Sequence, residues 1–546
     1  MLSTQEIADA LKLTAKLMEL HDENPFKIKS IANAAFKLNK TDIDLQDKSL
    51  QELEQIEGIG KSIAAKIHEL QTTGSLKELN EMVSKTPSGV IEMMSIKGIG
   101  PKKVARLWRE LEIESIGELL YACNENRLIT LKGFGAKTQA EVKKQIEFHQ
   151  SNRGKFHYAE VEEFANDLVN LLKKKYNTQY VSLTGTMRRK CEVIDKIEIL
   201  IASTNAVNID EVENKANVKT ELITCAENEF HHKLFETTAT EEHLEKVRRQ
   251  KAEDRIEEAT EKKFNSEEEI YKSFHLQYIE PELREGLSEV DLARENKIPK
   301  LIEFTDLRGI LHNHSTYSDG HNTLKEMAEY CKELGYEYLG ICDHSQSAFY
   351  ANGLKPERVM EQHLEIDQLN KNLFPFKIFK GIESDILNTG ALDYSDEILK
   401  TFDFVVASVH SNLKMNEEKA TERLIKAIEN PYTTILGHPT GRLLLSRSGY
   451  SINHKKVIDA CAANGVIMEL NAHPYRLDID WRWIPYCLEK GVMISINPDA
   501  HAKQGYHDMY YGTCVARKGI LTKEMCFNAL TLEKITTYFT NRKVKR

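Results

Sequence analysis

The sequence predicts a multidomain protein with a helical N-terminal third, an α+β middle region and a C-terminal parallel α/β barrel. A chain of 546 residues is too long for one hydrophobic core. Helical periodicity with few strand signals continues to about residue 155 and contains one glycine motif three times. From Leu307 onward, short apolar runs alternate with helical stretches, a pattern typical of parallel α/β folds.

The bulk composition indicates a soluble cytoplasmic protein. Hydrophobic residues make up 41% of the chain and charged residues 29%, and no run of about 18 apolar residues is present. The nine cysteines are scattered and include no CxxC pair, which favours reduced thiols over a disulfide framework. We therefore expect no association with a membrane.

The net charge of −10 is unevenly distributed. Residues 81–155 carry 13 Lys and Arg against 9 Asp and Glu, whereas residues 241–269 are crowded with acids. Because salt limits the reach of distant charges to about 10 Å, a locally basic segment can still bind phosphates.

The recurring glycine motif has an apolar lead-in, then Gly-apolar-Gly, then an amphipathic helix with basic residues near its start. The copies are LEQIEGIGKSIAAKIHEL, MMSIKGIGPKKVARLWREL and LITLKGFGAKTQAEVKKQI. Glycines permit a tight turn, and the following helix N-terminus offers free N–H groups to an anion. A single copy could simply join two helices, but three copies favour phosphate binding. The candidate residues are Gly58, Gly60, Lys61, Gly98, Gly100, Lys102, Lys103, Gly133, Gly135 and Lys137.

These motifs resemble helix-hairpin-helix motifs, which hold the DNA backbone without reading its sequence. The first copy lies in a segment similar to the small N-terminal domain of family X DNA polymerases, with Asn24, Pro25, Phe26 and Lys27 in the matching place. In some relatives this domain is a lyase, and the resemblance places the Schiff-base lysine on Lys66. The alternative is that Lys66 is an ordinary solvated lysine.

The middle region contains YVSLTGTMRRKCEVIDKIEILIAS, which resembles the nucleotide-binding signature in the palm of family X polymerases. Its turn and paired arginines match that signature at Gly185, Thr186, Arg188 and Arg189. Residues from Phe230 to Glu285 resemble the thumb of that family and its exit into a further domain.

The carboxylates of this signature do not match. The two aspartate positions become Lys196 and Glu198, and the third falls on Glu221. Two-metal phosphoryl transfer needs short anionic ligands, so a lysine there places a cation where metal charge must be held. Asp195 is adjacent, but a slip of one residue turns a strand side chain to the opposite face. We predict weak or absent polymerase activity, little Mg or Mn binding at this site, and a palm retained as a DNA-binding scaffold. The segment from Ala202 to Lys219 is also short for the family.

In the C-terminal region, the apolar runs end in residues that can bind metal. Because active sites of α/β barrels lie at the C-terminal ends of the strands, these side chains should meet. A chance origin for all of them is not credible, although any one could be an independent surface or core residue. The predicted ligands are His312, His314, Asp319, His344, Glu383, His410, His438, Asp499 and His501.

Nine ligands exceed what one ion can use, so we predict two or three divalent ions. Mixed imidazole and carboxylate ligands suit zinc, manganese or iron and argue against calcium. Glu383 could bridge two ions. Such ions would generate a metal-bound hydroxide at neutral pH and stabilise a phosphoryl group in transfer.

The segments HNHSTYSDG, CDHS, GIESD, SVHS, GHPTGR and NPDAH resemble the motif set of the PHP phosphoesterase domain. The whole order resembles a bacterial family X DNA polymerase with a C-terminal PHP domain. That resemblance implies a distorted seven-stranded (β/α)7 barrel, three metals and 3′-5′ exonuclease or related 3′-end processing in DNA repair. Residues that follow barrel strands could bind substrate phosphate or could be surface residues: Arg442, Arg447, His473, Arg476 and Arg482.

The expected domains are an 8-kDa-like helical domain (1–80), a fingers-like hairpin domain (81–155), a palm-like domain (156–235), a thumb-like domain and linker (236–300), and the PHP domain (301–546). We expect a monomeric exonuclease acting on gapped, nicked or 3′-recessed DNA. The alternatives are an active gap-filling polymerase with a proofreading nuclease, a histidinol-phosphatase-like small-molecule phosphatase, and a DNA-end-binding scaffold with a structural metal cluster.

Overall fold

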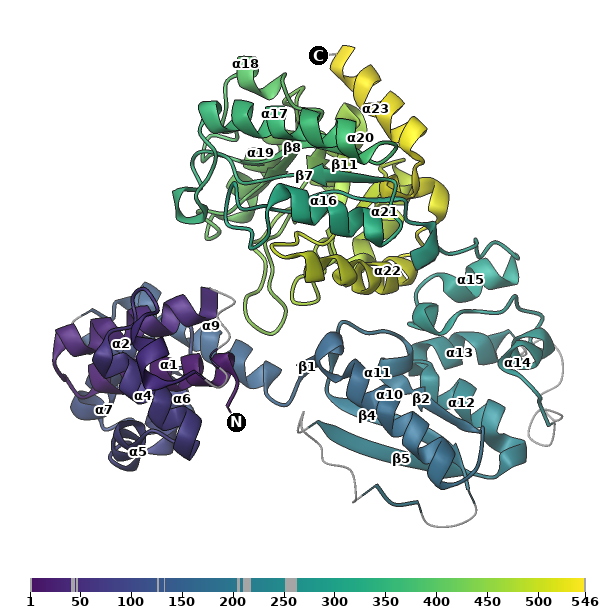
Figure 1. The fold of residues 1–546 in the computed structure, drawn as a ribbon. Helices are drawn as coiled ribbons and strands as arrows, with labels where there is room; N and C mark the ends of the chain where they lie inside the picture. Colours follow the sequence, from purple (N-terminus) through teal and green to yellow (C-terminus); the bar gives the residue numbers. More distant parts are fainter. Residues whose placement is uncertain are drawn as a thin grey trace. The chain divides into compact units, whose positions relative to one another are not determined.

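The computed structural model describes residues 2–40, 45, 48–124, 127–131, 133–203, 207–209, 218–250 and 263–544. The chain divides into two compact units, Met1–Arg153 and Gly154–Arg546 (Figure 1). The finer domain limits stay predictions, and most of the predicted short segment after Ala202 lies outside the described residues. Among the helices of the described residues, none is long and apolar enough to cross a membrane.

The first unit is helical throughout its described residues, which confirms the prediction for this region. Ser3 and Glu6 form a capping box that starts the first helix, and buried residues such as Ile7, Leu11 and Ala15 line one face of it. The helices are α1 (Thr4–Leu20), α2 (Pro25–Lys40), α3 (Leu50–Glu54), α4 (Lys61–Thr73), α5 (Lys77–Ser84), α6 (Ser88–Met93), α7 (Pro101–Leu111), α8 (Ile116–Asn124) and α9 (Ala136–Asn152).

The second unit begins with a small α+β region. Strand β1 (Phe156–His157) pairs with β3 (Val193–Ile194), and α10 (Tyr158–Lys175) follows β1. The other strands lie in the order β2 (Val181–Thr184), β4 (Lys196–Ala202), β5 (Lys219–Cys225), with β4 antiparallel to β2 and parallel to β5.

Alternation along β4 decides which of its side chains are buried. Ile197, Ile199 and Ile201 pack in the same core as the buried face of α10. The intervening residues therefore face the other side of the sheet, where Leu200 packs against Phe230 of the helix α12 (Phe230–Thr238). Lys196 and Glu198 share this second face.

Short helices join this region to the barrel. They are α13 (Glu241–Arg249), α14 (Glu267–Ser273) and α15 (Glu289–Arg294). Their core includes a fully buried Arg284, whose charge is paired with Glu267 and whose guanidinium lies over the ring of Tyr271.

The C-terminal region is a parallel barrel, as predicted. Its strands follow one another in sequence order, and each pairs in parallel with the next. They are β6 (Gly309–Ile310), β7 (Tyr338–Ile341), β8 (Lys377–Asp385), β9 (Phe404–Ser408), β10 (Ile435–Leu436), β11 (Ile467–Asn471) and β12 (Ile494–Asn497). A parallel bridge between Asn313 and Ala500 joins the ends of β6 and β12, so the sheet is nearly closed.

Helices surround the barrel and one helix closes its base. Figure 1 shows α16 (Leu324–Glu333), α17 (Pro356–Leu373), α19 (Glu417–Ile428) and α20 (His454–Asn464) around the strands. Inside, Phe379 and Phe404 pack against Phe539 of the helix α23 (Leu532–Val544). These aromatic rings fill the interior, which leaves the C-terminal ends of the strands for the polar residues. The remaining helices here are α18 (Asp396–Leu399), α21 (Ile484–Glu489) and α22 (Met509–Lys518).

Candidate metal centre

All nine predicted metal ligands lie together at the C-terminal ends of the barrel strands. They form four overlapping groups, and within each group the ligand atoms lie within 4.8 Å of one another. The groups are His314, Asp319, His344 and His501; His312, His438 and Asp499; His312, His314 and Glu383; and His344, Glu383 and His410.

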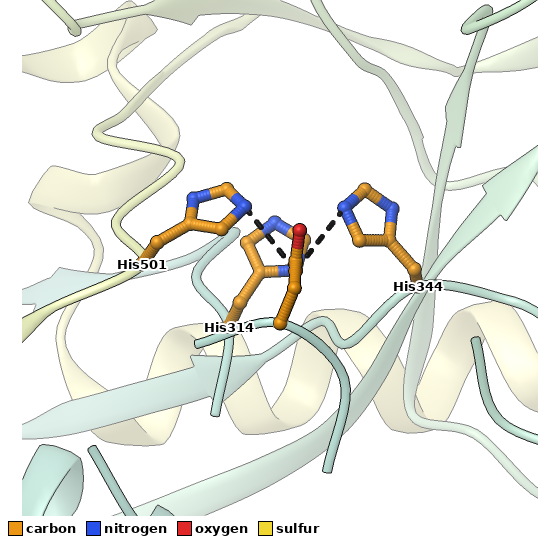
Figure 2. Close-up of side chains that lie close together, drawn as sticks. His314, His344 and His501 are labelled. Carbon is orange, nitrogen blue, oxygen red and sulfur yellow. Dashed lines mark ion pairs between the residues drawn. The ribbon is translucent and has the colours of Figure 1, made fainter. Parts of the chain in front are cut away.

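The first group is built around the carboxylate of Asp319. Nε2 of His344 lies 3.6 Å from its Oδ1, and Nε2 of His501 lies 3.4 Å from the same atom. Figure 2 shows the rings of His314, His344 and His501 close together, with dashed lines for the ion pairs of His344 and His501. The ring centroid of His314 lies 4.2 Å from that of His501 and 4.4 Å from that of His344, so the three imidazoles pack together.

Glu383 connects the other groups. Its Oε1 lies 3.1 Å from Nε2 of His410 and 3.0 Å from Nε2 of His438, while its Oε2 lies 2.9 Å from Nδ1 of His344. Nε2 of His312 is 3.2 Å from Oε1. The side chain is fully buried at the end of β8. A carboxylate whose two oxygens face different imidazoles is placed to bridge two cations.

The donor atoms of the cluster are arranged as ligands of divalent metal ions rather than as hydrogen-bond partners of one another. Nε2 of His312, Nδ1 of His344 and Oε2 of Glu383 are buried, and among the described residues none of the three has a hydrogen-bond partner despite the short separations. Buried polar atoms are normally hydrogen-bonded, so atoms that converge without bonding point to a shared ligand. Imidazole nitrogens with carboxylate oxygens are the donors of zinc, manganese and iron sites.

The electrostatics of the cluster are dominated by its opposite charges. Burial would raise the pKa of Glu383, but His410, His312 and His344 hold it well below its usual value. Burial would lower the pKa of His410, but Glu383 and Asp385 raise it to about 10. A metal ion bound at His410 would therefore have to displace a proton.

Two ligands have left-handed backbone conformations. The φ angles of His312 and Asp499 are 58° and 53°, and the backbone N–H of Asp499 donates to the carbonyl of His312 at 3.0 Å. Non-glycine residues in this region are strained, and such strain is concentrated at functional sites. The hydrogen bond lies where the segments after β6 and β12 meet. The contact that closes the barrel therefore also fixes the backbone positions of these two ligands.

In the palm-like region, a lysine occupies the centre of the carboxylate site. Nζ of Lys196 lies 2.8 Å from Oε1 of Glu198 and 2.8 Å from Oε2 of Glu221. Glu198 and Glu221 are register partners on β4 and β5, so both face the same side. Asp195 precedes β4 and is exposed. The ammonium group thus lies between the carboxylates that would have to hold a cation.

The paired arginines of this region are also engaged. Arg188 donates to Glu267 through Nη1 at 2.9 Å, and Arg189 donates to Glu285 through Nε at 3.1 Å. Gly185 has a φ of 58°, and a Cβ there would lie 1.9 Å from the carboxylate of Glu198. The turn matches the predicted signature, while its charged groups bind partners within the protein.

In the N-terminal unit, the three glycine motifs share one geometry. The first glycines have φ angles of 81° (Gly58), 90° (Gly98) and 91° (Gly133), which favour glycine over any other residue. The second glycine precedes the following helix in each copy. The apolar residues between them, Ile59, Ile99 and Phe134, are all buried. Each motif therefore places a helix N-terminus after an anchored turn, as phosphate binding requires.

Two lysines of this unit share one carboxylate. Lys66 and Lys27 both form ion pairs with Glu78, and the side chain of Lys66 is largely buried. The structure thus gives the candidate Schiff-base lysine an acidic partner.

Comparison with known proteins matches these regions to families. Residues 3–76 match the helix-hairpin-helix domain, residues 90–147 the SAM-like helix-hairpin-helix tandem, and residues 311–473 the PHP domain. A DNA polymerase/3′-5′ exonuclease PolX of Bacillus subtilis (strain 168) is 33% identical over 576 aligned residues, covering 98% of this chain and 99% of the relative. The chain belongs to the PolX family.

Other relatives match about a third of this chain. Probable phosphatases of Acetivibrio thermocellus and Caldanaerobacter subterraneus subsp. tengcongensis are 28% and 30% identical, over 35% and 36% of this chain and 78% and 77% of their own. A histidinol phosphate phosphatase from Lactococcus lactis, solved with zinc, L-histidinol and phosphate, aligns with a TM-score of 0.32 and 17% identity over 39% of this chain and 93% of its own.

The metal centre of this PolX-family chain includes two acidic residues that the sequence reasoning missed. Nδ1 of His312 lies 2.7 Å from Oε2 of Glu469, and Nδ1 of His410 lies 2.5 Å from Oδ1 of Asp385. Each carboxylate fixes the orientation of a ligand ring, as outer carboxylates do in metal sites. Asp385 lies two residues after Glu383 on the same strand. Because side chains two apart on a strand share a face, this spacing could have identified Asp385 from the sequence.

The predicted phosphate-binding residues have different surroundings. The guanidinium of Arg442 donates to Asp480 and to the carbonyls of Arg476 and Leu477. Arg447 donates to the carbonyl of Gly441. These contacts hold loops together at the mouth of the barrel.

Of the other three residues of that set, one contacts a candidate metal ligand and two have other partners. Nε of Arg476 lies 3.9 Å from Oδ2 of Asp499, so this arginine reaches the ligand cluster. Nδ1 of His473 accepts the N–H of Tyr475. Arg482 pairs with Glu192 and Asp480.

Proposed function

We propose that this PolX-family chain is a DNA-repair enzyme whose PHP domain removes nucleotides from DNA 3′ ends as a 3′-5′ exonuclease. The observation that carries the proposal is the gathering of nine ligand residues, in four overlapping groups, at the C-terminal ends of the barrel strands. The Bacillus subtilis relative, matched over nearly its whole length, is named for that activity. The proposed cofactors are two or three ions of zinc, manganese or iron.

The residues of the site would have different roles in the reaction. The cations held there would lower the pKa of water and offset the charge of a phosphoryl group in transfer. Glu383, whose carboxylate lies within 4 Å of five imidazoles, would hold cations together with those rings. Arg476 is the one predicted phosphate-binding arginine with a contact to a ligand, Asp499. Its guanidinium would contribute charge-assisted hydrogen bonds to the phosphate.

We further propose that the palm-like region binds DNA with weak or no polymerase activity. Lys196 places a positive charge between Glu198 and Glu221, where catalytic cations would have to bind. Arg188 and Arg189, which match the family's nucleotide-binding signature, pair with Glu267 and Glu285. A nucleoside triphosphate would have to compete with these carboxylates for the two arginines.

The three hairpins supply the proposed contact with the DNA backbone. Their helix N-termini and the lysines Lys61, Lys102, Lys103 and Lys137 offer positive potential without base-specific groups. This suits gapped, nicked or 3′-recessed ends of any sequence. A lyase role for Lys66 would require its amine to leave the ion pair with Glu78.

The substrate class is tested by comparing two reactions of the same purified, Mn²⁺-loaded protein. We expect release of mononucleotides from a 3′-recessed duplex and little hydrolysis of histidinol phosphate. The reverse preference would support the small-molecule phosphatase alternative. Binding of DNA without hydrolysis of either substrate would support the scaffold alternative. Glu383→Gln is the matched inactive control, because it preserves side-chain size and removes the negative charge that five imidazoles contact.

A further inference from the structure

Two exposed aromatic residues stand beside the metal centre. Phe349 and Tyr350 lie in a short 3-10 helix (η6, Phe349–Ala351) in the segment after β7. Their relative exposures are 87% and 57%. Rings exposed to this extent leave apolar surface in water, so this pair beside the metal centre is a candidate contact surface.

The pair lies close to a metal ligand. The ring centroid of Tyr350 is 6.4 Å from that of His344, which belongs to two of the ligand groups. The centroids of Phe349 and Tyr350 are 6.1 Å apart and their planes are inclined by 77°. Two rings at this angle offer one face and one edge to a planar group placed between them.

The segment that carries the pair is firmly held. Ala348 and Ala351, which flank the rings, are buried, and the N–H of Ala351 donates to the carbonyl of Ala348 at 2.9 Å. Nδ2 of Asn352 lies 3.3 Å from the carbonyl oxygens of both Tyr317 and Ser318. Ser318 immediately precedes the ligand Asp319, so the aromatic pair and this ligand are fixed to one another.

We propose that Phe349 and Tyr350 form a stacking platform for the terminal base of a DNA strand whose 3′-end phosphate enters the metal centre. The inference rests on the proposed function and adds the element that positions the end. The ligand groups of the metal centre are imidazoles and carboxylates, which suit cations and a phosphate, whereas the two uncharged rings suit the flat face of a base. Aromatic stacking accepts every base because each base has a π face, which suits an exonuclease without sequence preference.

The platform is tested first by activity. Phe349→Ala and Tyr350→Ala should each raise KM for a single-stranded 3′ end by roughly 5- to 150-fold, the range found when a stacking aromatic is removed. Release of a 3′-terminal abasic (tetrahydrofuran) residue from the same strand, which offers no base to stack, should change less than twofold. Phe374→Ala is the matched control, since Phe374 is 81% exposed and precedes β8 at the opposite end of the barrel from the ligands.

A binding measurement separates this inference from the proposed function. An oligonucleotide with 2-aminopurine at its 3′ end is titrated with Glu383→Gln protein, in which turnover is not needed. The platform is supported if Glu383→Gln protein quenches the fluorescence and the quenching is lost on adding Phe349→Ala, alone or together with Tyr350→Ala. This result would support the platform even if the protein proves not to be an exonuclease. Phe349→Tyr should retain the quenching. Undiminished quenching in the double aromatic variant, or an equal loss in release of the 3′-terminal abasic residue, would overturn the platform.

Discussion

Oε2 of Glu469 lies 2.7 Å from Nδ1 of His312, and this contact turns the other ring nitrogen of His312 toward Glu383, 3.2 Å away. Glu469 also accepts hydrogen bonds from Asn497 and from the backbone N–H of His438. One buried carboxylate on β11 therefore orients one ligand and supports a second.

Replacing this carboxylate should weaken metal binding. Glu469→Gln should lower metal affinity by about 10- to 100-fold, the usual effect of removing such a partner. The measurement is metal content by mass spectrometry after dialysis against graded chelator. Glu333→Gln, on the exposed side of α16, is the control. Unchanged metal content in a folded Glu469→Gln protein would contradict the role given to Glu469.

Lys196 should suppress cation binding in the palm-like region. In Lys196→Asp with Glu198→Asp, the positive charge is gone and the carboxylates are short, so we expect Mn²⁺-dependent primer extension to rise from the wild-type level. Single Lys196→Arg, which keeps the charge, should show no gain. Primer extension with dNTPs is measured in a Glu383→Gln background to remove degradation. Robust extension by the wild-type palm would contradict this prediction.

The same lysine predicts a pH effect. The contact with Lys196, aided by Lys219, lowers the pKa of Glu221 to about 2. A lowered carboxyl pKa stabilises the fold above the unfolded pKa, near 4.5, and that contribution disappears as the pH falls toward 2. Lys196→Met should raise the pKa of Glu221, detectable by NMR of labelled glutamate carboxyls. An unshifted Glu221 resonance would show that Lys196 does not lie between these carboxylates in solution.

The hairpin lysines should determine the salt dependence of DNA binding. Lys102→Ala with Lys103→Ala should weaken binding to all sequences alike and reduce the slope of log K against log salt by about 2, one unit for each lost phosphate contact. Lys12→Ala with Lys16→Ala, on α1 of the same unit, is the control. Fluorescence anisotropy at several salt concentrations gives the slopes. A sequence-dependent loss would indicate base contacts instead.

The sequence predicted which candidate ligands lie together, because their positions follow from strand topology. Parallel strands bring their C-terminal ends to one edge, so residues such as His344 and His438, distant in sequence, had to be neighbours. Glu469 escaped because it lies within a buried apolar strand rather than after one. Its role depends on which histidine ring it faces across the barrel, and a local sequence pattern does not specify that contact.

The charged side chains were harder to predict. The substitution at Lys196 was visible, but its contact with both Glu198 and Glu221 depends on the pairing of β4 with β5. Arg442 fitted a phosphate-binding role by its place after a barrel strand. Its hydrogen bonds to Asp480 and nearby carbonyls arise from the folding of two loops, which spacing alone does not specify.

The central claim is that the barrel cluster cleaves DNA 3′ ends. A primer–template incubated with Mn²⁺, with and without dNTPs, tests it most directly when wild type is compared with His344→Ala. We predict stepwise shortening of the primer from its 3′ end by the wild type, none by His344→Ala, and no extension when dNTPs are present. Shortening that persists in His344→Ala would place the nuclease elsewhere and contradict the account.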